Sequence, residues 1–390
     1  MLVAVGSWIS GAQAASSDHV ATDPYAKFGG PTFTLAPVSA DEIESPRAMS
    51  STFGSDWLDE ISSDPAPMSL ISEPVKVAGP AQAPGTRLVN RSGLPWRSGA
   101  ACARTVNNVT FEQWRQADLD VTILFAGRDS WSMILSHTGS GAVRGASRNS
   151  HASIGVALLP KSERGNFSAC ANGQFDSYYR QIGSALVGVE GGDAIIRLGW
   201  EMNGTWTSWF VGATDPGPYK ACFRRAVTQI KSTAPNVTIE WTPRSGSNEI
   251  RYPIELAYPG DDYVDQIGLL IYDFFPVIPN QTAWNNAYMA RERRTGGLKG
   301  IGTYLQFARA HGKKLAIAEW GVADGVKNSG GFDNPFFVQK MLEFSRKNTS
   351  SLGYEAYFNC DNVNADFYKI YPESLNPNAA AAYRNIMRSY

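Results

Sequence analysis

The sequence predicts an α/β fold: a single (β/α)8 TIM barrel preceded by a long, largely disordered N-terminal segment. From about residue 89 onward, short apolar runs alternate with helical segments, which is the pattern of βα units. Eight such units fit into roughly 300 residues, the usual size of this barrel. Several apolar runs also end in polar and aromatic residues, as barrel strands do where their C-terminal ends meet a functional site.

The region before residue 89 has a different character. Residues 1–14 hold an apolar run followed by Ala12-Gln13-Ala14, which fits a signal peptide with an A-x-A cleavage site. Residues 15–88 are rich in Ser, Pro, Ala and Asp, the composition of a low-complexity linker or disordered tail. We therefore expect a signal peptide (1–14), a linker (15–88) and a barrel domain (89–390). The expected location is the periplasm or the exterior of a bacterium.

The strands of the barrel domain are expected where short apolar runs occur. They cover residues 94–102, 121–126, 152–159, 195 onward, 237–243, 264–273, 314–321 and 353–359.

Helices are expected between these runs, except that the residues after 126 are taken as a loop containing Arg128, Asp129 and Trp131. Pro218 falls in the first turn of one expected helix, where its missing N–H costs nothing. The expected helices cover residues 111–117, 175–189, 218–232, 302–311, 335–348 and 379–387.

Composition limits the possible partners. Hydrophobic residues make up 43% of the chain, enough for a sizeable core, and the formal net charge is only −1. A nucleic-acid partner is therefore not expected, because phosphate binding requires a basic surface. No apolar run is long enough to span a membrane. The four histidines show no metal-ligand spacing, so we expect neither metal nor cofactor, and a metal-dependent hydrolase is a weak hypothesis. We expect a monomer.

The four cysteines form no C-x-x-C pair, and an even number in an exported chain favours disulfides. Barrel geometry selects the pairing. Cys102 follows the first strand and Cys360 the eighth, and these strands are neighbours when the barrel closes. Cys170 and Cys222 open two neighbouring helices. We therefore predict the disulfides Cys102–Cys360 and Cys170–Cys222, with four buried thiols as the alternative.

Two of the expected strands end in a glutamate beside a tryptophan. Glu201 follows the run that begins at Ile195, and Glu319 ends the run that begins at Lys314. Retaining glycosidases use two carboxyl groups about 5–5.5 Å apart, one as nucleophile and one as acid/base. A lone glutamate is usually a solvated charge. Two that end apolar strands among tryptophans are harder to explain by chance, and they suggest a glycosidase.

Three motifs resemble glycoside hydrolase family 26, the β-mannanase-like branch of a large barrel clan. Arg197-Leu198-Gly199-Trp200-Glu201-Met202-Asn203-Gly204 resembles the family's R-x-x-H-E-M-N-G element. Residues 258–268, continuing to Tyr272-Asp273, are similar to its strand 6 element, and residues 318–321 resemble its nucleophile strand. The resemblance implies a retaining endo-β-glycanase with Glu201 as general acid/base and Glu319 as nucleophile.

Neighbouring residues suggest how the two glutamates are tuned. An acid that is protonated at rest needs a raised pKa, and Trp200, Met202 and Trp206 can supply an apolar setting for Glu201. Tyr272 is placed to donate a hydrogen bond to Glu319. Arg197 is expected to orient Glu319, and the alternative is a structural salt bridge inside the barrel.

Other residues are candidates for sugar binding. Indole rings stack on the apolar faces of pyranoses, but core packing competes, and we expect half of these tryptophans in the core. Asn203 fits an N-x-T glycosylation acceptor, although its place beside Glu201 favours a structural or site role. The candidate stacking surfaces are Trp206, Trp209, Trp241 and Trp320, and the candidate cleft residues are Asp273, Phe274 and Asn359.

One departure from the family motif bears on the substrate. Trp200 stands where the family usually has a histidine that reaches the sugar, and indole donates one hydrogen bond and accepts none. The polysaccharide is therefore left open among β-mannan, β-glucan and a bacterial exopolysaccharide. The alternative function is a non-catalytic barrel that binds polysaccharide during export or assembly of an exopolysaccharide.

Overall fold

A computed structural model of the chain describes residues 90–187, 189, 194–246, 249–274, 276–323, 330–360 and 368–390. The expected signal peptide (1–14) and linker (15–88) lie outside the described residues. Among those described, no helix combines the length and the apolar character that crossing a membrane requires.

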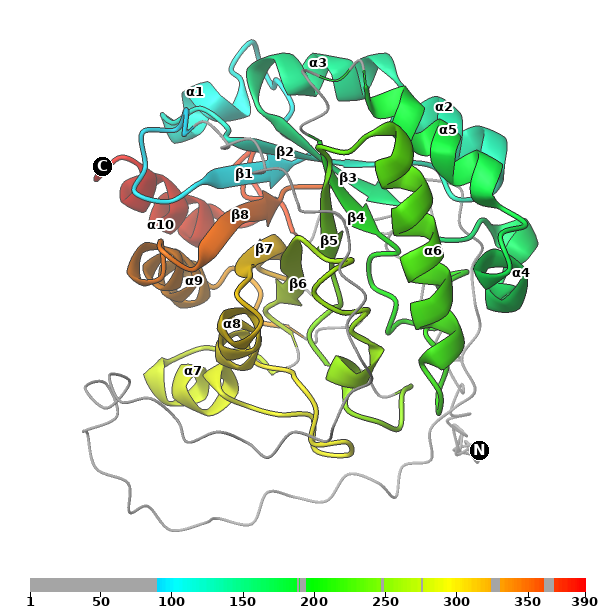
Figure 1. The fold of residues 1–390 in the computed structure, drawn as a ribbon. Coiled ribbons are helices and arrows are strands. Elements are labelled where there is room, and N and C mark those ends of the chain that lie inside the picture. The colour runs from blue at the N-terminus through cyan, green and yellow to red at the C-terminus, as the bar shows by residue number, and fades with distance from the viewer. Residues whose placement is uncertain are drawn as a thin grey trace, which may run out of the picture. The chain divides into compact units, whose positions relative to one another are not determined.

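Eight parallel strands form a closed barrel in which each strand pairs with the next along the chain (Figure 1). The barrel closes between the first and last strands, with Ala101 opposite Phe358. The predicted TIM barrel is therefore confirmed. The strands are β1 (Ser98–Ala101), β2 (Val121–Phe125), β3 (His151–Val156), β4 (Ile195–Leu198), β5 (Thr238–Trp241), β6 (Gln266–Tyr272), β7 (Lys314–Gly321) and β8 (Leu352–Phe358).

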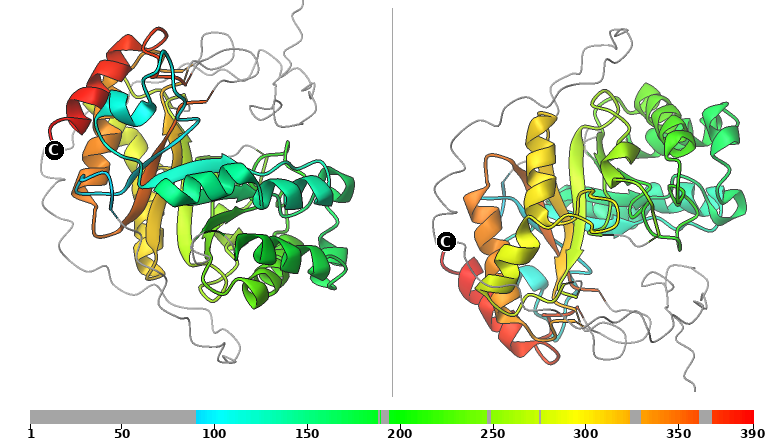
Figure 2. Two further views of the ribbon diagram at one scale, coloured as in Figure 1. Left: turned by 90° about the horizontal axis from the view of Figure 1, so that it is seen from above. Right: turned by 90° about the horizontal axis from the view of Figure 1, so that it is seen from below.

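Helices lie outside the ring of strands (Figures 1 and 2). The α-helices are α1 (Phe111–Arg115), α2 (Trp131–Thr138), α3 (Gly141–Asn149), α4 (Phe167–Ala171), α5 (Asp176–Leu186), α6 (Gly217–Thr233), α7 (Gln281–Tyr288), α8 (Ile301–Ala310), α9 (Pro335–Lys347) and α10 (Pro377–Met387). Two 3-10 helices, η3 (Lys161–Glu163) and η5 (Ile254–Ala257), complete the described elements, and η5 occupies the connection from β5 to β6.

The helices that the sequence left out are α2, α3, α4 and α7. The expected loop after residue 126 in fact contains α2, which begins after Ser130, and α3 follows after Ser140. Both serines accept a hydrogen bond from a backbone N–H in the first turn, from Met133 and Val143 respectively. These hydroxyls satisfy donors that a helix start leaves free, which fixes where each helix begins.

The buried side chains form two groups, because neighbouring residues on a strand point to opposite faces. The larger group joins the outer strand faces to the helices. The smaller group fills the barrel interior and includes Ile123 and Ile195 together with the small residues Ala316, Ala318 and Ala356. The small side chains leave room in the interior for a polar layer, which is described below.

Strand β7 departs from regular alternation just before its end. Ala316 and Ala318 belong to the interior group and Ile317 to the outer one. If this alternation continued, the side chain of Glu319 would point outward, toward the helices. The pairing of β7 with β8 shifts between Ile317 and Trp320, and its pairing with β6 shifts at Leu269 and Leu270. Such an irregularity re-aims a side chain. It lets Glu319 point into the barrel directly after Ala318.

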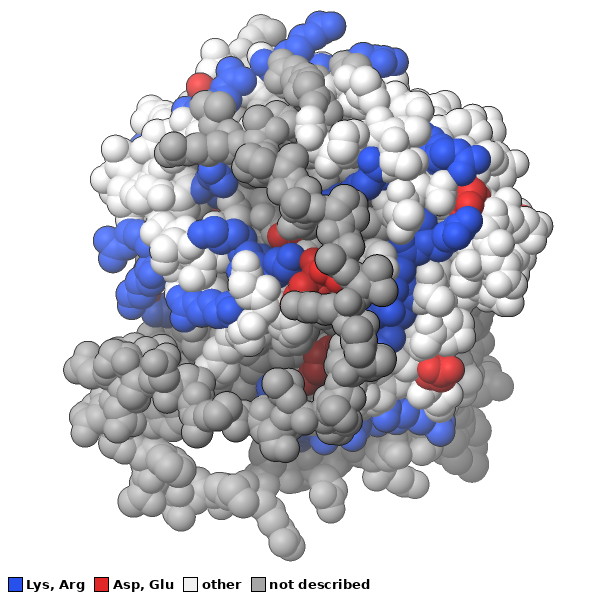
Figure 3. All heavy atoms as spheres, viewed as in Figure 1, with Lys and Arg blue, Asp and Glu red and all other residues white. Residues whose placement is uncertain are grey.

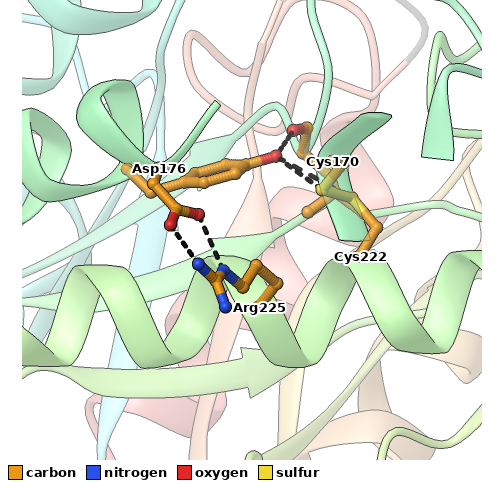
Figure 4. The surroundings of a disulfide bond; sticks show 6 residues. Cys170, Asp176, Cys222 and Arg225 are labelled. Atoms are coloured by element: carbon orange, nitrogen blue, oxygen red, sulfur yellow. Dashed lines mark hydrogen bonds and ion pairs between the residues drawn. A yellow bond between two sulfur atoms is a disulfide. The ribbon is translucent and has the colours of Figure 1, made fainter. Parts of the chain in front are cut away.

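Both predicted disulfides are present. Cys102–Cys360 joins the ends of β1 and β8, with Cα atoms 5.0 Å apart. Cys170–Cys222 joins α4 to α6 with a Cα separation of 5.1 Å. Figure 4 shows the second bond, with the Asp176–Arg225 ion pair linking α5 to α6 nearby. Each bond holds together neighbouring βα units, as the barrel argument requires.

Candidate active site

The chain changes direction sharply where β4 ends. Gly199 has φ +57°, and a Cβ atom there would lie 3.1 Å from Leu158 Cβ and 3.2 Å from Trp209 Cδ1. Glu201, two residues later, also lies in the left-handed region with φ 52°, which is uncommon for a residue other than glycine. Its N–H donates to the Thr242 carbonyl oxygen at 2.8 Å, which ties this turn to the end of β5. Strain of this kind concentrates at functional sites.

Glu201 is buried, with only 5% of its surface exposed. Burial and the negative charge of Glu319 raise its pKa to about 7, against the opposing effects of Arg244, Trp206 and Arg128. Trp206 Nε1 donates to Glu201 Oε2 at 3.2 Å, which leaves Oε1 to carry a proton. The expected raised pKa of Glu201 is therefore present through burial, whereas Trp206, expected to contribute an apolar surface, donates a hydrogen bond that lowers it. The carboxyl group exchanges its proton near neutral pH.

Glu319 is fully buried and is held by two donors. Arg197 Nη1 forms an ion pair and hydrogen bond with Oε1, and the Tyr272 hydroxyl donates to Oε2 at 2.9 Å. Both contacts were expected from the sequence, and both are present. Two donors from neighbouring strands fix the position of this carboxyl group.

A layer of polar side chains lies inside the barrel beneath this pair. Arg197 also donates to the Leu124 carbonyl oxygen at 3.1 Å and packs on the Phe125 ring at 4.8 Å. Burial opposes its charge, but Glu319 together with Tyr354 and Glu240 raises its pKa. Glu240 is buried and accepts hydrogen bonds from three side chains, those of Thr242, Gln266 and Tyr354, at 2.7–2.9 Å. Arg197 therefore lies in a site built for a cation.

Two arginines that sequence reasoning did not assign to the site act on Glu201. Arg128 follows β2 and is buried, and Arg244 follows β5 and is partly exposed. Burial lowers the pKa of Arg128, while Glu201 and Asp129 raise it. The Arg244 guanidinium lies over the Trp206 ring, 4.8 Å from its centroid. The sequence did contain a signal for both arginines, because each closely follows an expected strand, where barrel loops carry site residues.

Asn203 positions Arg244. Its amide Nδ2 donates to the carbonyl oxygens of Arg244 and Gly246 at 2.9 and 3.1 Å, and the Arg244 N–H donates to Asn203 Oδ1 at 3.0 Å. The side chain is 1% exposed, so its role is structural and it presents no surface to a glycosylating enzyme.

Comparison with known proteins bears on this geometry. Residues 189–296 match the model of glycosyl hydrolase family 26. Over this segment the chain is similar to glycoside hydrolase family 26. The matched segment contains Glu201, Arg244 and Tyr272, whereas Glu319 lies beyond it. No curated protein sequence matches the chain significantly.

Solved structures agree with the fold. The endo-β-1,4-mannanase of Cellulomonas fimi superposes with a TM-score of 0.54 at 17% identity, covering 74% of this chain and 70% of that one. The catalytic domain of the Bacillus sp. JAMB-750 endo-β-1,4-mannanase gives 0.53 at 17% identity, covering 76% and 87%. A β-mannanase from Bacteroides ovatus gives 0.51 at 14%, covering 76% and 90%. At these identities the likeness concerns the fold alone.

The four candidate tryptophans divide unevenly between the site and the core. Trp206 is half-buried beside Glu201, whereas Trp209, Trp241 and Trp320 have no exposed surface. Trp241 packs against Tyr258 at 5.3 Å, and Trp320 donates to Glu355 at 2.5 Å and packs against Tyr357. Three of the four candidate stacking surfaces are therefore core residues, one more than expected, because these rings point away from the site or lie beneath it.

Two candidate cleft residues are also corrected. Asp273 is fully buried, and its carboxylate accepts from the Ile278 N–H at 2.7 Å and from Asn334 Nδ2 at 2.6 Å. Asn359 accepts from the Ile370 and Tyr371 N–H groups at 3.0 Å. Both side chains hold the loops after their strands in place. Phe274 is partly exposed and lies 6.1 Å from Tyr272, ring to ring.

Trp200, which replaces the histidine of the family motif, is 2% exposed. Its ring packs against Trp209 at 4.8 Å and Phe125 at 5.8 Å, and its carbonyl oxygen accepts from Trp209 Nε1 at 2.8 Å. The indole is therefore a core residue of the turn that carries Glu201 and presents almost no surface to a ligand.

Proposed function

We propose that the protein hydrolyses internal β-glycosidic bonds of a polysaccharide with retention of configuration, using Glu201 as general acid/base and Glu319 as nucleophile. The observation that carries the proposal is the contrast between the two buried carboxyl groups. Glu201 has a pKa raised to about 7, whereas Glu319 is fixed by an ion pair with Arg197 and a hydrogen bond from Tyr272. A carboxyl group that exchanges its proton near neutral pH, beside a second one held in place by two donors, supports the roles of acid and nucleophile.

In the first step, a Glu319 carboxylate oxygen attacks the anomeric carbon and the bond to the leaving oxygen breaks. Glu201 delivers its proton to that oxygen, and the shortened polysaccharide leaves as an alcohol. The charge on Glu319 is consumed when the covalent glycosyl-enzyme forms. Loss of that charge lowers the pKa of Glu201, because the repulsion from Glu319 disappears. Glu201 is thereby prepared to act as a base.

In the second step, Glu201 takes a proton from a water molecule while the water oxygen attacks the anomeric carbon. The bond to Glu319 breaks and returns its electron pair to the carboxylate. Arg197 and Tyr272 stabilise the anion that reappears. Two inversions at the anomeric carbon give net retention, and the enzyme returns to its starting protonation state.

The polysaccharide class is proposed from the match to the family model and only at the level of the family. The superposed mannanases act on β-1,4-linked mannan, and the enzyme is proposed to act on a β-mannan, a β-glucan or a bacterial exopolysaccharide. Two disulfides favour an oxidising compartment, and export to the periplasm or exterior is proposed with them. The enzyme is proposed to work as a monomer.

Chemical rescue with azide tests both roles. In Glu201→Ala acting on an aryl β-glycoside, azide should restore turnover and yield the β-glycosyl azide, because it intercepts the glycosyl-enzyme. In Glu319→Ala, azide should replace the nucleophile and yield the α-glycosyl azide. The opposite stereochemistry would exchange the two roles. Full activity of either variant without azide would end the proposal.

A non-catalytic polysaccharide-binding barrel is the alternative. It predicts that purified protein binds mannans, β-glucans or exopolysaccharides without shortening them. Size-exclusion analysis of each polymer after incubation decides between the two functions. Glu201→Ala serves as the matched control, since it should bind and leave chain length unchanged.

A further inference from the structure

Two guanidinium groups flank the carboxyl group of Glu201. Arg128 comes from the end of β2 and Arg244 from the end of β5, on either side of β4 in the barrel order. On the face shown in Figure 3, most of the visible charged side chains are Lys and Arg, which gather on both sides of a few acidic side chains near the middle.

The backbone of Arg244 is fixed by hydrogen bonds, whereas its guanidinium group has weaker contacts. Asn203 bonds the N–H and C=O of Arg244, and the guanidinium lies over the Trp206 ring. The head also pairs with Glu249 at 3.2 Å, but these two side chains are 22% and 28% exposed. A partly exposed pair of this kind is weak, so another anion can take the place of Glu249 at little cost.

Trp206 is the one half-buried ring among the four tryptophans at the strand ends, and a cation lies on its face. A neutral sugar would stack on that face by contact with the indole alone. A sugar that bears an anion gains the guanidinium as well, through paired N–H···O bonds whose geometry matches a carboxylate or a sulfate.

The two arginines carry a cost if the substrate is neutral. Positive charges beside a general acid favour its ionised form and oppose its task. An anionic group bound between the arginines would neutralise them and restore the proton affinity of Glu201 once substrate is in place. The unfavourable effect of the two arginines on the proton of Glu201 is therefore removed in the enzyme–substrate complex, where the acid must act.

We propose that the polysaccharide cut by this enzyme carries an anionic group, either a uronate carboxylate or a sulfate ester, that binds Arg244 and Arg128 beside Glu201. The inference rests on the proposed hydrolase function. Asn203 is the positioning residue for Arg244.

The test compares polymers that differ only in charge. A uronate-containing β-linked polysaccharide is assayed beside its carboxyl-reduced form, and a sulfated one beside its desulfated form, with β-mannan and β-glucan as neutral references. We expect the charged member of one pair to be cut with kcat/KM about 10- to 100-fold above its neutral partner, the range of a charge-assisted bidentate contact. The pair that responds identifies the anion.

Variants separate a binding role from a structural one. Arg244→Met keeps the apolar length over Trp206 and should erase most of the preference by raising KM, and Arg128→Met should act in the same direction. Arg225→Met is the matched control, because Arg225 lies on the outer helix α6, is 42% exposed and pairs with Asp176 on α5. For the wild type, higher salt should raise KM for the charged polymer, and for Arg244→Met this dependence should flatten.

Three outcomes overturn the inference. The first is that a neutral mannan or glucan is cut at least as well as every charged polymer. The second is that Arg244→Met leaves the preference for the charged polymer unchanged. In both cases hydrolysis is observed and the proposed function stands. If none of the polymers is shortened by the wild-type enzyme, the proposed function fails and the inference falls with it.

Discussion

Glu201 and Glu319 are the same residue type at the same end of one barrel, yet their surroundings differ. Glu319 lies within strand β7 and is fixed by donors from β4 and β6, Arg197 and Tyr272. Glu201 lies beyond β4 on a turn with φ 52° and is bonded by one indole N–H. The fixed carboxyl group of Glu319 suits attack on carbon, and the carboxyl group of Glu201 suits proton exchange. The position of each glutamate relative to the end of its strand therefore separates the two proposed roles.

The largest expected effect comes from removing the fixed carboxyl group. Glu319→Gln should lower kcat by about 10³-fold or more, because the amide cannot attack the anomeric carbon. The variant keeps the shape of Glu319, so thermal unfolding should show a folded protein. Glu319→Ala should lose activity equally and also lose stability, since it leaves the Arg197 cation buried alone. A Glu319→Gln variant with wild-type kcat would show that Glu319 is not the nucleophile and would remove the proposed difference in role between Glu319 and Glu201.

Breaking the ion pair from the other side should cost stability first. Arg197→Met leaves Glu319 without its cation in a fully buried position and should reduce the free energy of unfolding by about 3–5 kcal/mol. Arg291→Met removes an exposed pair and should change it by about 0–1 kcal/mol. Urea unfolding of the three proteins measures both values. Equal losses in the two variants would mean that the buried pair is no more important than a surface one.

The raised pKa of Glu201 predicts a pH-dependent stability term. A carboxyl group whose folded pKa is about 7 stabilises the fold in its protonated form, fully so below pH 4.5, its ordinary value. That stabilisation is lost as the pH rises from about 4.5 to 7 and amounts to about 3 kcal/mol. The Glu201→Gln variant lacks this pH-dependent contribution, because an amide does not titrate in this range.

The measurement is unfolding of the wild type and of Glu201→Gln between pH 4.5 and 8. Relative to the variant, the wild type should become progressively less stable across this range. In the wild type, kcat/KM should also fall above about pH 7, where the acid loses its proton. A stability difference that stays flat with pH would show that Glu201 titrates as an ordinary carboxyl group.

The smallest effect is expected at Tyr272. Tyr272→Phe removes the hydrogen bond to Glu319 Oε2 but leaves the ring packed against Phe358 and Tyr368. One such bond to a charged group is worth about 1.5–3 kcal/mol, so kcat should fall by about 10- to 100-fold with little change in unfolding temperature. If kcat is unchanged, Arg197 alone fixes the nucleophile.

Much of the fold was predictable because it depends on local patterns. Apolar runs located the strands to within a few residues, and β7 was placed with its observed bounds. The helices α2 and α3 were missed because both are short, and α3 also contains Gly141 and Gly145, which favour a loop interpretation. Their serine caps were the signal that was overlooked.

Within the site, the predictions that succeeded depend on strand order, and those that failed depend on side-chain direction. Tyr272 and Arg197 reach Glu319 because their strands stand around one ring. Trp241 and Trp320 were misplaced because adjacency to a strand end does not say whether a ring faces the mouth or the helices. Arg244 was not assigned because its contact with Trp206 joins two loops that are distant in the sequence.

By itself the sequence determined the barrel and the two disulfide pairs and singled out the two glutamates as candidates, since each follows from periodicity, order along the chain or a contiguous motif. Only the tertiary structure decided which tryptophans are core, how a shift in β7 turns Glu319 inward, and why Glu201 holds its proton near neutral pH. Proton affinity depends on burial and on charges brought close from other strands. Those distances exist only once the barrel has closed.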